Sequence, residues 1–285
     1  MKYAWIEDNR LEFEIGRMCT VLAVSRSGYY DWRARAPSKR AQDNALLDTQ
    51  VASLHSAHHA RYGRPRIMRE LKRQGIRVSS ERVRNSLNRQ GLRALYRRPY
   101  RNTTDSNHNK PVASNILNRQ FEPGTPNGAW VCDITYIATG QGWLYLACVL
   151  DLGTRRIVGW SMSERMKAQL VCDALTMAYL TRAPKPGLIV HSDQGVQYAS
   201  AQYRALLAKY KMVQSMSRRA NCWDNAAMES TFKSLKVECV YTTRFETRDQ
   251  AIAEVFKWIE LYYNRVRLHS ALNYRSPEQF ENQLT

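Results

Sequence analysis

The region after residue 129 most constrains the fold, because three β-rich apolar runs follow one another with only short turns between them. They are W-V-C-D-I-T-Y-I from Trp130, W-L-Y-L-A-C-V-L-D from Trp143 and R-R-I-V-G-W-S-M from Arg155. Such runs predict an antiparallel meander. Helical patterns at 167–182, 200–210 and 223–240 then alternate with short apolar strands at 188–191 and 212–215. The order βββ-α-β-α-β-α predicts an α/β domain with helices flanking a mixed sheet, as in the ribonuclease H-like fold.

Three acidic residues stand at informative places in these elements. Asp133 lies within the first expected strand, Asp193 lies just past the strand 188–191, and Glu229 lies on the helix 223–240. Sites in α/β proteins tend to open at the ends of strands. Three carboxylates supply the hard oxygen ligands that Mg²⁺ prefers. A pair of such ions about 4 Å apart can activate a nucleophile and stabilise a leaving oxygen on phosphorus.

The helix 223–240 carries polar and apolar residues on different faces. Asn225, Glu229, Lys233 and Lys236 are spaced four, four and three residues apart, so they share one face. In that arrangement Glu229 points into a groove beside two lysines that can hold a DNA phosphate. A plain surface ion pair between Glu229 and Lys233 is the alternative for this helix taken alone.

The charge of the chain points to a polyanionic partner. The formal net charge is +18 and the pI is about 9.9. Residues 1–110 carry 23 Lys/Arg and 10 Asp/Glu (+13), whereas residues 111–285 carry 20 and 15 (+5). The six cysteines form no C-x-x-C pair, and the longest apolar run, 143–150, is too short to span a bilayer. We therefore expect a cytoplasmic protein that binds nucleic acid and no membrane.

Residues 61–91 predict a DNA-binding helix-turn-helix. Pro65 suits a first helical turn, Gly75 ends that helix, Ser79 or Ser80 caps the next, and Gly91 ends it. Basic and amide side chains of this motif are expected to face DNA, with a solvated basic face as the alternative. These candidates are Arg64, Arg66, Arg82, Arg84, Asn85 and Arg89.

We expect five segments along the chain. Residues 1–36 form a short helical segment, for which a helix-turn-helix and a small packing hairpin are both open. The others are an all-α helix-turn-helix domain, a polar linker rich in helix-breaking residues, the ribonuclease H-like core, and a C-terminal helical extension. Their ranges are 37–98, 99–122, 123–243 and 244–285.

Sequence boxes around the three acids resemble a known family. D-I-T-Y-I, H-S-D-Q-G-V-Q-Y and D-N-A-A-M-E-S-T-F-K-S-L-K resemble the acidic boxes of the retroviral-integrase-like transposases, with 35 residues between Asp193 and Glu229. The segments Y-G-R-P-R-I, G-W-L-Y-L-A-C-V-L-D-L-G-T-R-R-I-V-G-W-S-M and S-P-E-Q-F extend the likeness over nearly the whole chain. They look like the OrfB transposase subunit of the bacterial insertion sequences of family three.

The resemblance implies a role for several residues. Asp133, Asp193 and Glu229 would be catalytic ligands of two Mg²⁺ ions, which Mn²⁺ can replace, and Lys236 would contact substrate DNA. The chemistry implied is cleavage of the element's ends and strand transfer without a covalent enzyme–DNA intermediate. The partners implied are terminal inverted repeats, target DNA, a second copy of the chain in a dimer, and the upstream-frame (OrfA) product, fused or separate.

Further residues beside the boxes are candidates with structural alternatives. His191 is expected either to support the site or to play a structural role. Gln194, Asn225 and Tyr198 are expected either to touch DNA or to act as local caps. Arg218 and Arg219 are expected to grip the DNA strand from a loop over the site. Two other functions remain open: a DNA-binding regulator without catalysis, and a ribonuclease H-like nuclease that only hydrolyses.

Overall fold

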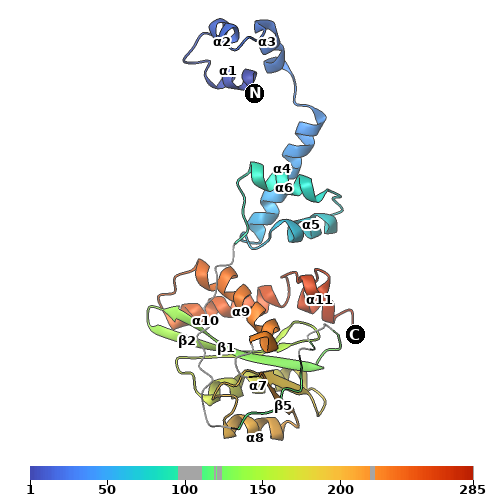
Figure 1. The fold of residues 1–285 in the computed structure, drawn as a ribbon, viewed down its shortest axis with the longest axis vertical. Coiled ribbons are helices and arrows are strands. Elements are labelled where there is room, and N and C mark those ends of the chain that lie inside the picture. The colour runs from blue at the N-terminus through green and yellow to red at the C-terminus, as the bar shows by residue number, and fades with distance from the viewer. Residues whose placement is uncertain (96–110, 119, 121–123, 219–221, 285) are drawn as a thin grey trace.

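The computed structural model describes residues 1–95, 111–118, 120, 124–218 and 222–284. Figure 1 shows three parts along the long axis of the molecule. A small helical cluster holds the N-terminus, a long helix leads from it to a second helical unit, and an α/β core carries the C-terminal half. The predicted combination of an all-α N-terminal region with an α/β core is confirmed.

The N-terminal cluster consists of α1 (Lys2–Asp8), α2 (Ile15–Val21) and α3 (Arg26–Ala34). Its buried centre is small and is made by Ile6, Met18, Cys19 and Tyr29. Ser25 caps α3 by accepting a hydrogen bond from the Gly28 backbone. Residues 22–25 join α2 and α3, so the helical pair expected in this segment is present.

The second unit has the predicted helix-turn-helix order. Its elements are α4 (Lys39–Ala57), α5 (Arg64–Arg73) and α6 (Ser80–Arg89). Ser79 caps α6 by accepting from the Arg82 backbone, as its sequence position indicates. Gly75 and Gly91 have positive φ and end α5 and α6. Leu47, Val51, Ile67, Leu71 and Val83 form the buried centre.

The core is built on a five-stranded sheet in the order β3-β2-β1-β4-β5. The meander β1 (Ala129–Thr139), β2 (Gly142–Asp151) and β3 (Ile157–Ser163) is antiparallel. The strands β4 (Ile189–Ser192) and β5 (Val213–Met216) run parallel to β1. This is the ribonuclease H-like arrangement that the element order predicted.

Helices cover both faces of the sheet (Figure 1). On one face lie α7 (Ala168–Arg182) and α8 (Ala201–Lys209), packed on Trp130 and Cys132 of β1. On the other lie α9 (Ala226–Glu238) and α10 (Arg248–Phe256), packed on Val131 and Ile137. Successive side chains of a strand point to opposite faces. Odd-numbered residues of β1, Asp133 among them, therefore belong to the α9 face.

Short helical elements complete the C-terminal half. The 3₁₀ turn η1 (Cys222–Asn225) precedes α9, and η2 (Val240–Thr242) follows it. After α10 the chain continues as a π-helix, η3 (Lys257–Tyr263), and then as η4 (Ser270–Leu272) and α11 (Pro277–Glu281). The π-helix departs from regular α-helical geometry within the segment 244–285, where a helical extension was expected.

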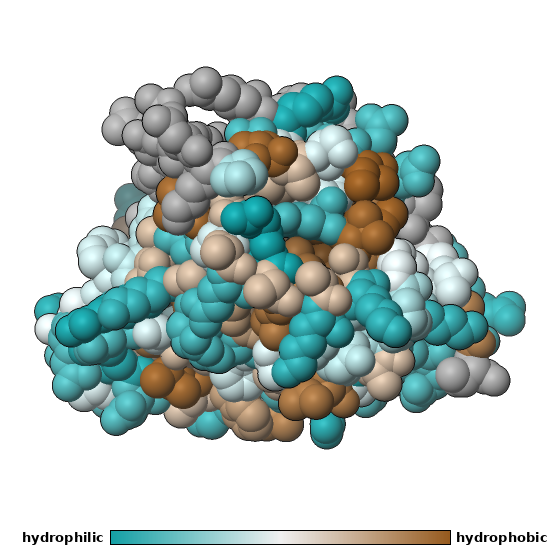
Figure 2. All heavy atoms as spheres, turned by 90° about the horizontal axis from the view of Figure 1, so that it is seen from below, coloured by the Kyte–Doolittle hydropathy of each residue, from teal (hydrophilic) through white to brown (hydrophobic). Residues whose placement is uncertain are grey.

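Part of the predicted linker packs on the core. The backbone amides of Ile116 and Leu117 donate to Ser215 Oγ on β5, at 2.9 and 3.2 Å, and Leu117 is buried. Among the residues described, no helix is long and apolar enough to cross a membrane. Viewed from the α8 end, the surface is mainly hydrophilic with scattered hydrophobic spots (Figure 2).

Candidate active site

Asp133 and Asp193 come together because their strands are parallel neighbours. The register of β1 and β4 pairs Val131 with His191, and two residues further along it leads to Asp133 and Asp193. Asp133 Oδ1 accepts from the Ile134 amide at 2.8 Å, and Asp193 Oδ1 accepts from the Gly195 amide at 2.9 Å. These bonds fix each carboxylate against its own backbone.

Glu229 lies in the first turn of α9, which packs across β1. Met228, Phe232 and Leu235 of α9 enter the core on the Asp133 face of the sheet. The Glu229 side chain is 30% exposed, and its Oε2 lies 3.7 Å from Lys233 Nζ. The i,i+4 ion pair considered as the plain alternative is therefore present, on the helix face that the spacing predicted.

The three carboxylates interact electrostatically. Burial raises the pKa of Asp133 well above its usual range, and the negative charges of Asp193 and then Glu229 raise it further. The nearby Lys236 ammonium opposes this effect. Within the described part of the chain, no three His, Cys, Asp or Glu side chains are grouped as metal ligands. The three acids thus lie near one another where β1 runs beside the carboxyl end of β4, and they do not form a ligand set there.

Two of the expected DNA contacts on α9 are buried instead. Lys236 is 7% exposed, and its Nζ lies 4.5 Å from the centre of the Tyr136 ring. Asn225 is 5% exposed and donates from Nδ2 to the Cys132 carbonyl at 3.1 Å. Asn225 therefore ties the start of α9 to β1 immediately before Asp133. In this structure both side chains position the site and do not present themselves to DNA.

The three supporting candidates also turn inward. His191 is fully buried, and its Nδ1 and Nε2 lie 2.9 and 3.1 Å from the hydroxyls of Ser215 and Ser217. Burial lowers the pKa of His191 to about 4, so the ring is neutral. Gln194 Nε2 donates to the Ser217 carbonyl at 2.9 Å. Tyr198 is 2% exposed. The structural alternative thus describes His191, and the DNA contact expected of Tyr198 is wrong for this structure.

Asp224, which was not singled out in the sequence, organises the loop beside the site. Its carboxylate is fully buried and accepts from the backbone, Nε and Nη2 of Arg218 and from Asn115 Nδ2, at 2.8–3.0 Å. Arg218 remains 52% exposed. Arg219 lies outside the described residues. A buried aspartate bound by an arginine six residues earlier leaves no periodic signal in the sequence.

The basic residues of the helix-turn-helix divide into two groups. Arg66 Nε donates to the Leu268 carbonyl at 3.0 Å, and its Nη1 lies 3.9 Å from Glu238, so this side chain joins the helical unit to the core. Its expected role in DNA binding is wrong for this structure. The others are exposed, namely Arg64, Arg82, Arg84, Asn85 and Arg89. Arg89 also forms a bidentate pair with Asp48, which links α6 to α4.

Comparison with known proteins gives the family of each part. The families described as Integrase core domain match residues 123–222 and 229–284, and an HTH-like domain matches residues 41–100. The chain is 46% identical over 284 residues to the transposase InsF for insertion sequence IS3A of Escherichia coli (strain K12), with 99% of each covered.

One further relative and one solved structure also resemble the chain. A 31 kDa protein of insertion element IS600 from Shigella sonnei, described as uncharacterized, is 44% identical over 263 residues, which is 92% of this chain and 97% of that one. The HTLV-2 integrase catalytic core domain, solved in complex with magnesium, aligns with 55% of this chain and 97% of its own. Its identity is 16% and its TM-score 0.42.

Proposed function

Because this chain belongs to the integrase-core transposases of IS3-type insertion sequences, we propose that Asp133, Asp193 and Glu229 are its catalytic acids. The observation that carries the assignment is that two neighbouring parallel strands bring Asp133 and Asp193 together, and that the helix packed on β1 carries Glu229 to the same region. The charges of Asp193 and Glu229 act on Asp133, which is expected of acids that share a site.

The chemistry of the three acids fits a divalent cation. Their oxygen atoms are hard ligands, and their mutual repulsion is the kind that a bound cation relieves. We propose that Asp133, Asp193 and Glu229 would hold two Mg²⁺ ions, or Mn²⁺ in their place. When bound, such ions activate an attacking oxygen and stabilise a leaving oxygen on phosphorus.

Each of the three acids is held in place by a different part of the fold. Asp133 is held by a strand, Asp193 by its bond to the Gly195 amide, and Glu229 by a helix packed on β1.

In the first step water attacks a phosphodiester at the element's end, and the bond to the 3′-oxygen breaks. The freed 3′-hydroxyl then attacks a second phosphodiester, whose own 3′-oxygen leaves as a hydroxyl, so that one element end is joined to the flank of the other.

The DNA and protein partners follow from family membership. We propose that the DNA substrates are the terminal inverted repeats and the target, and that a dimer of this chain holds them. The upstream-frame (OrfA) product is the proposed second protein, fused or separate. The reaction on chromosomal DNA would take place in the bacterial cytoplasm.

Product analysis separates this function from the two alternatives. With Mg²⁺ and duplexes that carry the element's ends, we expect both cleaved strands and joined strands. A regulator without catalysis would give a gel shift and intact DNA. A nuclease that only hydrolyses would give cleaved strands and no joined ones. The measurement is denaturing gel electrophoresis of end-labelled DNA, with EDTA in the matched control.

The exposed face of α6 is the proposed DNA contact. Arg84 is 56% exposed and pairs with Glu81 of the same helix, at 2.6 Å. We expect Arg84→Ala to weaken duplex binding and to reduce the slope of log affinity against log salt by about 0.9, the value for one phosphate contact. Arg165→Ala, on an exposed arginine of the core, is the control. An unchanged slope in Arg84→Ala would move the contact away from this helix.

A further inference from the structure

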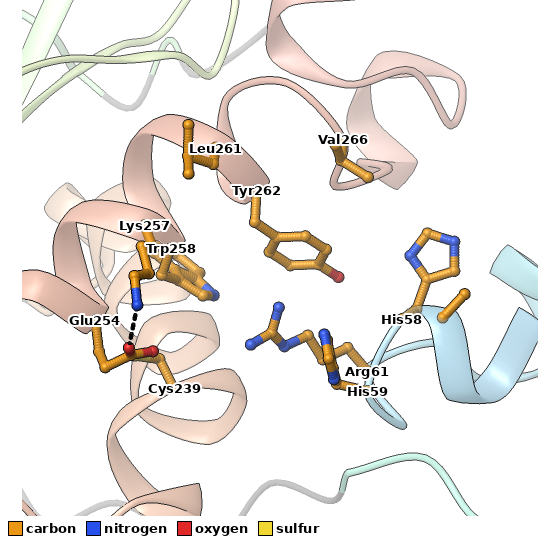
Figure 3. A pocket seen from close by; sticks show the side chains of 11 residues that line it. His58, His59, Arg61, Cys239, Glu254, Lys257, Trp258, Leu261, Tyr262 and Val266 are labelled. Atoms are coloured by element: carbon orange, nitrogen blue, oxygen red, sulfur yellow. Dashed lines mark hydrogen bonds and ion pairs between the residues drawn. The ribbon is translucent and has the colours of Figure 1, made fainter.

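A cavity lies where the helix-turn-helix unit meets the C-terminal helices of the core. Its volume is about 370 Å³. One wall is the turn after α4, with His58, His59 and Arg61, and the opposite wall is the π-helix η3, with Trp258 and Tyr262 (Figure 3). π-helical turns are rare and are frequent at functional sites. The cavity is separate from the three acids and has no part in the chemistry described above.

Two hydrogen-bonding groups of the π-helix lack a partner at this cavity. Trp258 Nε1 and Tyr262 OH are buried, and neither has a hydrogen-bond partner among the residues that the structure describes. The Trp258 side chain as a whole is only 2% exposed. Figure 3 shows the nitrogen-bearing edge of Trp258 and the Tyr262 ring beside the guanidinium of Arg61. Because an unsatisfied buried donor destabilises the folded state, native proteins usually give such a group a partner.

The charge of the lining selects the kind of partner. The Arg61 guanidinium lies 4.4 Å from the centre of the Tyr262 ring, and its Nε donates to the Glu238 carbonyl at 3.1 Å. Glu254 is the carboxylate in the lining, and it pairs with Lys257 at 2.7 Å. An indole N–H is a donor only, and a guanidinium beside it suits the oxygens of a phosphate.

We propose that this cavity receives a phosphate group, held by Trp258 Nε1, Tyr262 OH and the Arg61 guanidinium. Cys239, in the cavity lining and immediately after the end of α9, follows Glu229 by ten residues, which corresponds to roughly 15 Å at the rise of an α-helix. The cavity thus lies between the helix-turn-helix and the acids. A phosphate of the DNA backbone bound there would fix the path of the strand, a role that rests on the proposed function.

The indole N–H signal of Trp258 tests the proposal directly. The full chain labelled with ¹⁵N at its seven tryptophan indoles gives seven signals, and Trp258→Phe identifies the one that belongs to Trp258. A 20-base-pair duplex is added without divalent ions in one arm. Inorganic phosphate is added in the other, against chloride at equal ionic strength. We expect the duplex to move the Trp258 signal downfield.

The two arms separate the sources of the phosphate. A shift with inorganic phosphate and none with the duplex would assign the cavity to a free anion and overturn the DNA path. A Trp258 signal that neither addition moves would overturn the proposal altogether. The test uses no catalysis, so it can fail while cleavage and joining proceed, and it can succeed if they do not.

Affinity measurements supply a second readout. The double variant Trp258→Phe/Tyr262→Phe keeps an aromatic ring at each position and removes both polar groups. We expect it to bind the duplex about tenfold or more weakly, since a hydrogen bond to a charged group contributes about 1.5–3 kcal/mol. Trp143→Phe/Tyr241→Phe, at two exposed positions, is the matched control and should bind as the wild type does. Equal affinity of the two double variants would contradict the proposal.

Discussion

Asp193→Asn is expected to abolish DNA cleavage and joining while DNA binding survives. The substitution removes one negative charge from the group of three acids and changes little else, because an amide oxygen can still accept from the Gly195 backbone. Metal-assisted chemistry on phosphorus provides several kcal/mol of stabilisation, and each 1.36 kcal/mol corresponds to a factor of ten. We therefore expect the rate of both steps to fall by roughly a thousandfold or more.

The measurement pairs product gels with a binding titration on the same DNA. Asp173→Asn is the matched control, because Asp173 is an exposed aspartate on α7, on the other face of the sheet. It should leave cleavage, joining and affinity as they are. Magnesium-dependent joining by a pure Asp193→Asn preparation would remove Asp193 from the catalytic set.

The sequence was sufficient to predict the sheet, the main helices and the element on which each of the three acids lies. Patterns of period two and period 3.6 report which residues are buried, and the strand order follows from short connections and helical crossovers. Asp133, Asp193 and Glu229 lie near one another because β1, β4 and α9, which position them, are adjacent in this topology. The close grouping expected of metal ligands is not present among the described residues.

The bonding partners of individual polar residues could not be predicted from the sequence. Arg66 and Arg84 look alike in the chain, yet Arg66 binds the Leu268 carbonyl, 202 residues away, and Arg84 stays exposed. Residue spacing placed Asn225 on the polar helix face expected to meet DNA, but its side chain donates to the Cys132 carbonyl. The π-helix was also missed, because its wider turn depends on packing that no local periodicity expresses. Long-range partners decide such cases.

Arg267→Ala is expected to cause the largest loss of stability among the substitutions considered. Arg267 is 6% exposed and donates from Nε and Nη2 to the Glu238 carboxylate at 2.8–3.0 Å, and from Nη2 to Ser234 Oγ. Glu238, at the end of α9, is 5% exposed. Removing one partner leaves a buried charge without its main counterion, which costs about 3–5 kcal/mol.

Chemical denaturation followed by tryptophan fluorescence measures this loss as a lower midpoint. Arg244→Ala is the control, because the Arg244–Glu246 pair is 92% and 68% exposed and should contribute little. The double variant Arg267→Ala/Glu238→Ala should recover part of the loss, since no buried carboxylate remains. If Arg267→Ala and Arg244→Ala lower the midpoint equally, the pair does not hold the end of α9. In that case the positioning of Glu229 must depend instead on the contacts of α9 with β1, where Asn225 and Phe232 meet the strand.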